Sequence, residues 1–171
     1  MALSRAERER LIDQYAAGAA RLHGAFAAVP EPVRQWRPSP ADWSAHEVVC
    51  HCADSESNAS LRIRYLIVEA EPLIVGYDQE AWARVLDYHA RPVQTALATV
   101  EAVRANTVPL LHALPEAAWA KEGRHTESGR YTAEDWLRIY AEHLEIHARQ
   151  IEQNLAVWQN MGGLEGPPKP P

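Results

Sequence analysis

The sequence has few lysines, few cysteines and a single phenylalanine, and each shortage narrows what the protein can be. Only two of its 171 residues are lysines, Lys121 and Lys169, and the formal net charge is −6 with a pI near 5.7. A surface that binds nucleic-acid phosphates needs clustered lysine and arginine side chains, whereas the arginines here are dispersed. We therefore expect no nucleic-acid partner.

Long apolar stretches are also missing. No apolar run approaches the roughly 18 to 20 residues that cross a bilayer, and the chain starts with MALSRAERERLIDQ, which is charged where a signal peptide would be apolar. These absences predict a cytoplasmic protein with no membrane partner. A chain of 171 residues, 47% apolar and 23% charged, is typical of one globular domain.

The only two cysteines are Cys50 and Cys52, in the triplet Cys-His-Cys. Residues at i and i+2 of a helix point about 200° apart, so these two cannot bridge each other on a helix. The triplet resembles a zinc motif, but helical geometry sends its three side chains in three directions. We favour small buried apolar residues over metal ligands for both cysteines.

Caps and prolines predict four long helices and no convincing strand. The expected helices cover about residues 4 to 28, 44 to 69 or 70, 92 to 112 or 114, and 132 to 158. Pro109 predicts a kink or break in the third of them. A short helix around Trp82 and a long loop over residues 115 to 130 should connect them. Four long helices indicate an all-α bundle over residues 1 to 160, followed by a disordered Gly/Pro-rich tail at 161 to 171.

The segment YAEHLEIHAR, residues 140 to 149, places His143 and His147 four residues apart on the last predicted helix. At about 100° per residue, one arc of this helix is charged and polar: Arg138, Glu142, Glu145, Arg149, Glu152 and Gln153. The two histidines lie within the opposite, apolar arc: Leu137, Ile139, Tyr140, Leu144, Ile146, Ile151 and Leu155. We therefore expect both imidazoles to face the bundle interior.

Two interpretations of this histidine pair are possible. A single inward-facing histidine is usually a core residue bonded to a neighbour, but two of them one turn apart must both be desolvated and satisfied in one small volume. A divalent metal would satisfy both. The spacing matches paired zinc ligands on helices, although the glutamate that follows the first histidine in zinc proteases is absent.

A metal also needs a third ligand from a facing helix. The second predicted helix carries a polar stripe of Glu47, His51, Asp54, Asn58, Arg62, Tyr65 and Glu69. This stripe is either a solvent face or a polar cavity in which His51 is the third ligand, and the residues alone leave both open. His46 lies about 140° from His51 and is expected at the surface. His125, just before the last helix, is placed to reach the open end of a bundle site.

Four segments in this order resemble the DinB/YfiT-like superfamily. They are WSAHEVVCHCAD at 43–54, LPEAAW at 114–119, GRHTESGRYTAEDW at 123–136 and HLEIHARQI at 143–151. The resemblance extends over roughly residues 5 to 157. It implies a four-helix bundle in up-down-down-up order with long connecting loops, commonly a homodimer. It also implies a metal, usually zinc or nickel, held at the positions of His51, His143 and His147.

The resemblance implies a metal-dependent enzyme acting on a small molecule. Characterised relatives are often transferases or isomerases that use bacillithiol, mycothiol or glutathione, and many others carry only a hydrolase label. Our hypothesis is a thiol-dependent S-transferase or a hydrolase with an open coordination position. Candidate groups around the metal or substrate are Glu47, Asp54, Asn58, Arg62, His125 and Tyr140. In this hypothesis Asp54 or Glu47 orients His51 through its second ring nitrogen, and His125, Arg62 or Tyr140 handles substrate charge or protons. The alternatives are a non-catalytic metal- or ligand-binding stress-response protein, and a polar core without a metal.

Overall fold

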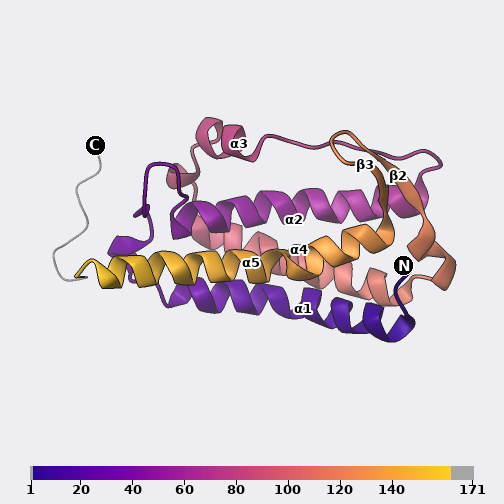
Figure 1. Cartoon of the computed structure of the whole chain (residues 1–171), viewed down its shortest axis with the longest axis horizontal. Coiled ribbons are helices and arrows are strands. Elements are labelled where there is room, and N and C mark those ends of the chain that lie inside the picture. The colour runs from indigo at the N-terminus through magenta and orange to yellow at the C-terminus, as the bar shows by residue number, and fades with distance from the viewer. Residues whose placement is uncertain (1, 163–171) are drawn as a thin grey trace.

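A computed structural model describes residues 2 to 162 as a bundle of four long helices with a small sheet at one end (Figure 1). The long helices are α1 (Arg5–Ala27), α2 (Ala45–Val68), α4 (Val93–Ala113) and α5 (Ala133–Asn160). Their ends differ from the predicted ones by only one or two residues, so the predicted fold class is confirmed. Residues 163 to 171 of the predicted disordered tail lie outside the described residues.

Three of the long helices begin at the side-chain caps that the sequence predicts. In each, a hydroxyl accepts from a backbone N–H, and an acidic side chain accepts from the cap's own backbone. The pairs are Ser4 with Glu7, Ser44 with Glu47, and Thr132 with Asp135. Pro109 lies inside α4 without ending it, so the helix has no break at this predicted position.

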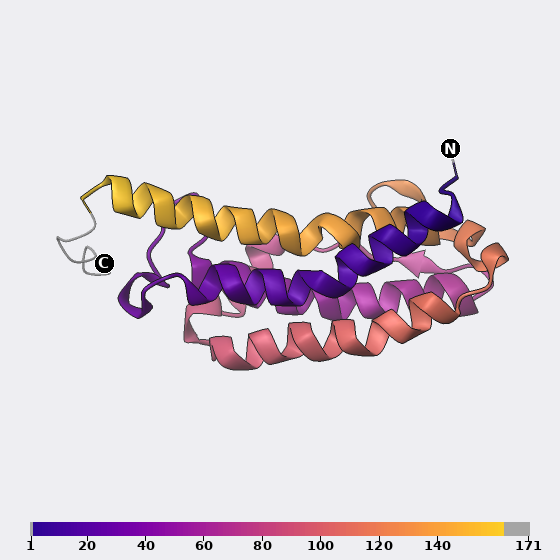
Figure 2. The same cartoon turned by 90° about the horizontal axis from the view of Figure 1, so that it is seen from below.

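The helices follow the up-down-down-up order. α1 and α5 run in one direction, while α2 and α4 run in the other (Figure 1). α1 packs against α5 and α4, and α2 packs against the same two helices, so α1 and α2 lie on a diagonal of the bundle (Figure 2). α2 and α5, distant in sequence, are therefore neighbours.

The core consists of two apolar clusters with a polar layer between them. One cluster includes Leu22, Cys52, Val100 and Leu144. The other includes Tyr15, Ala59, Leu111 and Trp136. Each cluster contains residues from all four long helices, so the polar layer between the clusters extends across the whole bundle. As predicted, Cys50 and Cys52 are buried free thiols, and burial raises the pKa of both.

The prediction that the chain has no strand is wrong. β1 (Leu73–Ile74) pairs in parallel with β2 (Glu122–His125), which pairs antiparallel with β3 (Gly129–Thr132). The predicted long loop at 115 to 130 is thus a 3-10 turn, η3 (Glu116–Ala120), followed by a hairpin. Gly129, the first residue of β3 after the hairpin turn, has φ of 79°, a conformation that glycine adopts without strain. Strands of two to four residues are too short to show an alternating pattern.

A long crossing joins α2 to α4. Because these helices are parallel, the chain must return along the bundle between them, and it does so beside α2 (Figure 1). The crossing contains α3 (Gln79–Val85), which confirms the short helix predicted around Trp82, and the 3-10 turn η2 (Tyr88–Ala90). A third such turn, η1 (Glu31–Val33), lies between α1 and α2. Among residues 2 to 162, no helix is both long and apolar enough to cross a membrane.

The apolar arc predicted for α5 is only partly correct. Leu137, Leu144 and Ile151 are fully buried, but Ile139 is 50% exposed and Ile146 is 52% exposed. The angular count places these two isoleucines at the margin of the apolar arc.

Candidate metal centre

The structure brings together the three histidines that the sequence proposes as ligands. His51 projects from α2, and His143 and His147 project from α5 across the interface between these helices. One potential ligand atom of each lies within 4.8 Å of the others. The ring centroids are 4.7 Å apart for His143 and His147, and 5.7 and 4.8 Å from His51 to these two. The polar stripe of α2 is thus an interior face at His51, which is 1% exposed.

Hydrogen bonds orient the two imidazoles of α5. Nδ1 of His143 lies 3.1 Å from Oε1 of Glu56, and Nδ1 of His147 lies 2.9 Å from Oε1 of Gln150. Carboxylate and amide oxygens only accept, so both Nδ1 atoms carry the proton and both Nε2 atoms keep a lone pair. Second-sphere bonds of this kind typically orient metal-bound histidines.

His51 differs from the other two because its Nδ1 is buried and has no hydrogen-bond partner among the described residues. The indole of Trp43 lies against its ring, with centroids 4.8 Å apart, so apolar surface covers this imidazole. A buried polar atom without a partner is uncommon and unfavourable. One of these three adjacent imidazoles has an unpartnered buried nitrogen, and the other two carry the proton on Nδ1 and a lone pair on Nε2. This donor set suits a divalent transition metal.

Burial keeps two of the three histidines, His51 and His147, uncharged. It lowers the pKa of His51 to about 2, with further lowering from His147 and His143. Burial and His143 likewise lower the pKa of His147 to about 4. A metal ligand must be a neutral imidazole, and these environments keep the two groups neutral at physiological pH.

A second polar group lies beside the histidines. The ring of Tyr140 is 5.5 Å from that of His143, and its hydroxyl oxygen accepts from Nη1 of Arg62 at 3.0 Å. Burial raises the pKa of Tyr140, so the phenol remains protonated at neutral pH. Oγ of Ser55 lies 3.3 Å from Nε2 of His143. Tyr140 thus lies beside His143, and Arg62 lies beside Tyr140.

His125 does not join the three-histidine cluster. It ends β2, its Nδ1 accepts from the backbone of Glu127 and Ser128, and its ring lies 5.6 Å from that of Tyr131. Burial and the charge of Arg62 lower its pKa, which places it near that guanidinium. His125 therefore lies at the sheet end of the bundle, near the Arg62 and Tyr140 pair.

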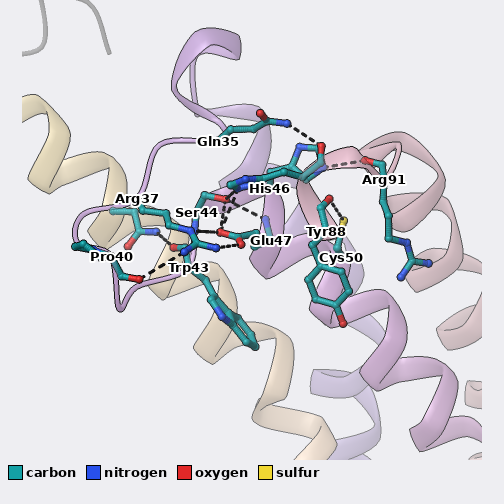
Figure 3. Close-up of polar contacts among 12 residues, drawn as sticks. Gln35, Arg37, Pro40, Trp43, Ser44, His46, Glu47, Cys50, Tyr88 and Arg91 are labelled. Carbon is teal, nitrogen blue, oxygen red and sulfur yellow. Dashed lines mark hydrogen bonds and ion pairs between the residues drawn. The ribbon is translucent and has the colours of Figure 1, made fainter. Parts of the chain in front are cut away.

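Glu47 belongs to a separate polar cluster at the start of α2 (Figure 3). The hypothesis that it orients His51 is wrong. Its carboxylate, 2% exposed, accepts from Arg37 and Ser44 and lies 3.2 Å from Nε2 of His89. This cluster joins the loop before α2 to the end of the crossing and so fixes the start of the helix that carries His51.

Two other predictions about α2 are corrected by contacts with the crossing. Asp54 accepts from the Tyr88 hydroxyl at 2.8 Å and from Arg91 at 2.9 Å, so it does not orient His51. His46, expected at the surface, is 8% exposed and its Nε2 donates to the Arg91 carbonyl oxygen at 2.9 Å. Both side chains connect α2 to the crossing at Tyr88 and Arg91. The sequence pattern of α2 alone does not show that the crossing covers this part of the helix. Asn58 donates to the Asp54 carbonyl oxygen within α2.

Four groups near the histidines were not among the predicted site residues: Trp43, Ser55, Glu56 and Gln150. Glu56 falls outside the predicted polar stripe, yet it is fully buried and contacts His143. Burial works to raise its pKa, but the charge of Arg104 and bonds from His143 and Arg104 outweigh burial and lower it. An acidic residue among small residues in the middle of α2 was the only sequence signal for it.

Fold and site together define a four-helix bundle with an internal three-histidine centre. Such centres in helical bundles are built from side chains on facing helices. The chain belongs to the DinB superfamily, whose family model matches residues 14–151. The family resemblance expected from the sequence is thereby confirmed.

Similar proteins include two bacterial relatives, each named "Putative metal-dependent hydrolase". The relative from Oceanobacillus iheyensis is 33% identical over 109 residues, which cover 64% of this chain and 63% of the relative. The relative from Bacillus mycoides is 31% identical over 109 residues, covering 64% and 62%. The matched region thus spans less than two thirds of either relative's length.

The fold is similar to that of YfiT from Bacillus subtilis, described as "a probable metal-dependent hydrolase with an unusual four-helix bundle topology". The TM-score is 0.85 at 23% identity, over 94% of this chain and 91% of YfiT. This likeness confirms the four-helix bundle topology.

Replacing Glu47 with glutamine tests the cluster at the start of α2. Burial opposes ionisation of Glu47, but Arg37, Ser44 and His89 outweigh it and lower its pKa. Its stabilisation is therefore complete above the ordinary carboxyl pKa and disappears as pH falls through the lowered value. We expect Glu47→Gln to reduce the free energy of unfolding by about 1 to 3 kcal/mol at neutral pH, and by less in acid.

Urea unfolding at neutral pH and at about pH 3 measures this difference. Glu152→Gln is the matched control, because Glu152 pairs with Arg21 on the surface and should contribute less than about 1 kcal/mol. Equal losses for the two variants at neutral pH would contradict a structural role for Glu47.

The pH dependence of the metal-free protein tests the burial of the imidazoles. His51 and His147 have folded pKa values of about 2 and 4, below the ordinary 6.5, so the unfolded chain binds more protons in acid. The free energy of unfolding should therefore fall as pH drops below about 6.5, by up to about 1.4 kcal/mol per pH unit for each histidine.

The measurement is urea unfolding of chelator-treated protein between about pH 7 and pH 5. A His51→Gln/His147→Gln variant serves as the control and should show a shallower slope. A slope identical to that of the unsubstituted protein would show that these imidazoles do not remain neutral in the fold.

Proposed function

We propose that this chain is a divalent-metal-dependent hydrolase whose metal ligands are His51, His143 and His147. The observation that supports this most directly is the convergence of three potential ligand atoms within 4.8 Å, from two neighbouring helices. The names of the Oceanobacillus and Bacillus relatives, and the description of YfiT, point to the same class of activity. Zinc or nickel as the metal, a thiol co-substrate and a homodimer remain predictions from the family resemblance.

The residues around the cluster suit hydrolysis. His51, His143 and His147 would hold a divalent metal, which would supply Lewis-acid activation of a water molecule or of a thiol as its thiolate. The chain itself supplies Tyr140, whose phenol oxygen accepts from Arg62 and whose raised pKa keeps the phenol protonated. A protonated phenol beside the cluster can stabilise an oxyanion that develops on a carbonyl substrate. Ser55 and Arg62 lie on the same side, next to Nε2 of His143 and the Tyr140 hydroxyl respectively.

Metal content tests the ligand assignment. We expect about one divalent ion per chain in protein purified without a histidine tag, and loss of this ion in His51→Ala, His143→Ala and His147→Ala. Elemental analysis after reconstitution with zinc and with nickel measures it. His125→Ala is the control and should keep the metal, because His125 lies outside the cluster. Unsubstituted protein that takes up neither metal would refute the proposal.

Catalysis is tested with the metal-loaded protein on a panel of esters and amides. We expect hydrolysis that a chelator abolishes, and a fall in kcat of about 100- to 1,000-fold for Tyr140→Phe with unchanged metal content. The same preparation assayed for thiol S-transfer decides between hydrolase and transferase. Activity that survives in His51→Ala would exclude the mechanism, and metal without either activity would support a binding protein.

A further inference from the structure

Arg104 is the most deeply buried arginine among the described residues. It belongs to the long helix that lies diagonally opposite α5 in the bundle. It projects from α4 and is 1% exposed. Its Nε and Nη2 donate to the two carboxylate oxygens of Glu56 at 3.0 and 2.7 Å. Nη2 also donates to the Tyr140 carbonyl oxygen at 2.9 Å, and Nη1 donates to the Tyr15 carbonyl oxygen. The guanidinium is therefore held by α2, α5 and α1 at once.

Glu56 connects this guanidinium to the candidate metal centre. Its side chain is fully buried, and Oε1 accepts both from Arg104 and from Nδ1 of His143. The bidentate bond with Arg104 fixes the plane of the carboxylate, because guanidinium and carboxylate forks match in geometry. The carboxylate in turn holds the proton of His143 on Nδ1 and leaves a lone pair on Nε2, which lies 3.3 Å from Oγ of Ser55.

A buried ion pair alone is weak grounds for a role in stability. Two apolar residues of similar volume often stabilise a fold equally well, because both charges must be desolvated. Arg104 and Glu56 lie in the polar layer between the two apolar clusters, at the level of His143. The pair of Arg8 and Glu134 is nearly as buried, yet neither member contacts a histidine of the cluster. The two ion pairs therefore differ in one respect: Glu56 bonds to a candidate metal ligand, His143.

The sequence of α1 leaves space for this guanidinium. Gly18 is buried in the middle of α1, and a Cβ atom there would lie 2.3 Å from Nη1 of Arg104 and 3.2 Å from Cβ of Leu144. A glycine inside a helix is less favourable than alanine by about 1 kcal/mol. Gly24, on the same helix, is exposed, and a Cβ atom there would meet nothing within 4 Å. Of these two glycines, only Gly18 is thus required by the position of Arg104.

We infer that Arg104 is a positioning residue for the metal centre, acting through Glu56 to fix the tautomer and orientation of His143. The inference deepens the proposed function and rests on it for its effect on metal affinity. α4, which carries none of the three proposed ligands, would thereby control how well the other helices bind the metal. A substitution on α1 that displaces the guanidinium should therefore also weaken metal binding.

Paired substitutions test this through metal affinity. Gly18→Ala displaces the guanidinium without changing any charge, and Gly24→Ala is its control on the same helix. Glu56→Gln/Arg104→Met removes the buried pair, and Arg8→Met/Glu134→Gln is its control. We expect the zinc dissociation constant to rise about 10- to 100-fold in Gly18→Ala and Glu56→Gln/Arg104→Met, and to stay unchanged in both controls.

Competition with a chromogenic chelator measures the affinity, and circular dichroism confirms that each variant is folded. The absorption bands of the cobalt-substituted protein report coordination geometry and should change only in the two test variants. Gly18→Ala keeps the test decisive if Glu56→Gln/Arg104→Met does not fold. Zinc affinity in folded Gly18→Ala equal to that of Gly24→Ala would overturn the inference.

A metal-free measurement separates this inference from the proposed function. Imidazole nitrogen resonances of the metal-free protein show which nitrogen of His143 carries the proton. We expect Nδ1–H in the unsubstituted protein and in Arg8→Met/Glu134→Gln, and a mixture of tautomers in Glu56→Gln/Arg104→Met or Gly18→Ala. An unchanged tautomer in the test variants would refute the positioning role, whether or not the protein binds zinc. Absence of zinc binding with the expected tautomers would refute only the proposed function.

Discussion

Three imidazoles, of which His51 is buried and the other two are partly buried, share one small volume between α2 and α5, and the middle layer of the bundle is arranged around them. A neutral imidazole has one donor and one acceptor, and each needs a partner where water is excluded. Glu56 and Gln150 accept from the donors of the two α5 histidines. The carboxylate of Glu56 is itself buried and must be compensated, which brings Arg104 from α4 into the same layer. Desolvation of one cluster thus accounts for polar groups on three helices.

The chain connectivity determines which helices can build such a site. In the up-down-down-up order, α2 and α5 are adjacent although about 90 residues separate His51 from His143. The parallel pair α2 and α4 requires a crossing that returns beside α2, and this crossing covers part of the polar stripe. Its residues Tyr88 and Arg91 bond to Asp54, and His89 lies against Glu47. Because the crossing packs over the first half of α2, the polar stripe there is buried against protein and does not face solvent.

Sequence patterns predicted the helices well and the site in part. The angular count placed His143 and His147 inside the bundle, and the structure brings them together with His51. The same count placed Ile139 and Ile146 in the apolar arc, although both are half exposed. A helical wheel gives the direction of a side chain but does not show how far neighbouring helices extend over it. The sheet was missed because strands of two to four residues have too little pattern to detect.

By itself, the sequence determined the local features of this protein. Capping boxes at Ser4, Ser44 and Thr132 and the helical spacing of apolar residues depend on neighbours within a turn or two, so they can be read along the chain. Only the tertiary structure decided that Glu56, and neither Glu47 nor Asp54, bonds to a histidine of the cluster. The partner that holds Glu56 is 48 residues away, on a helix whose packing position no local pattern encodes.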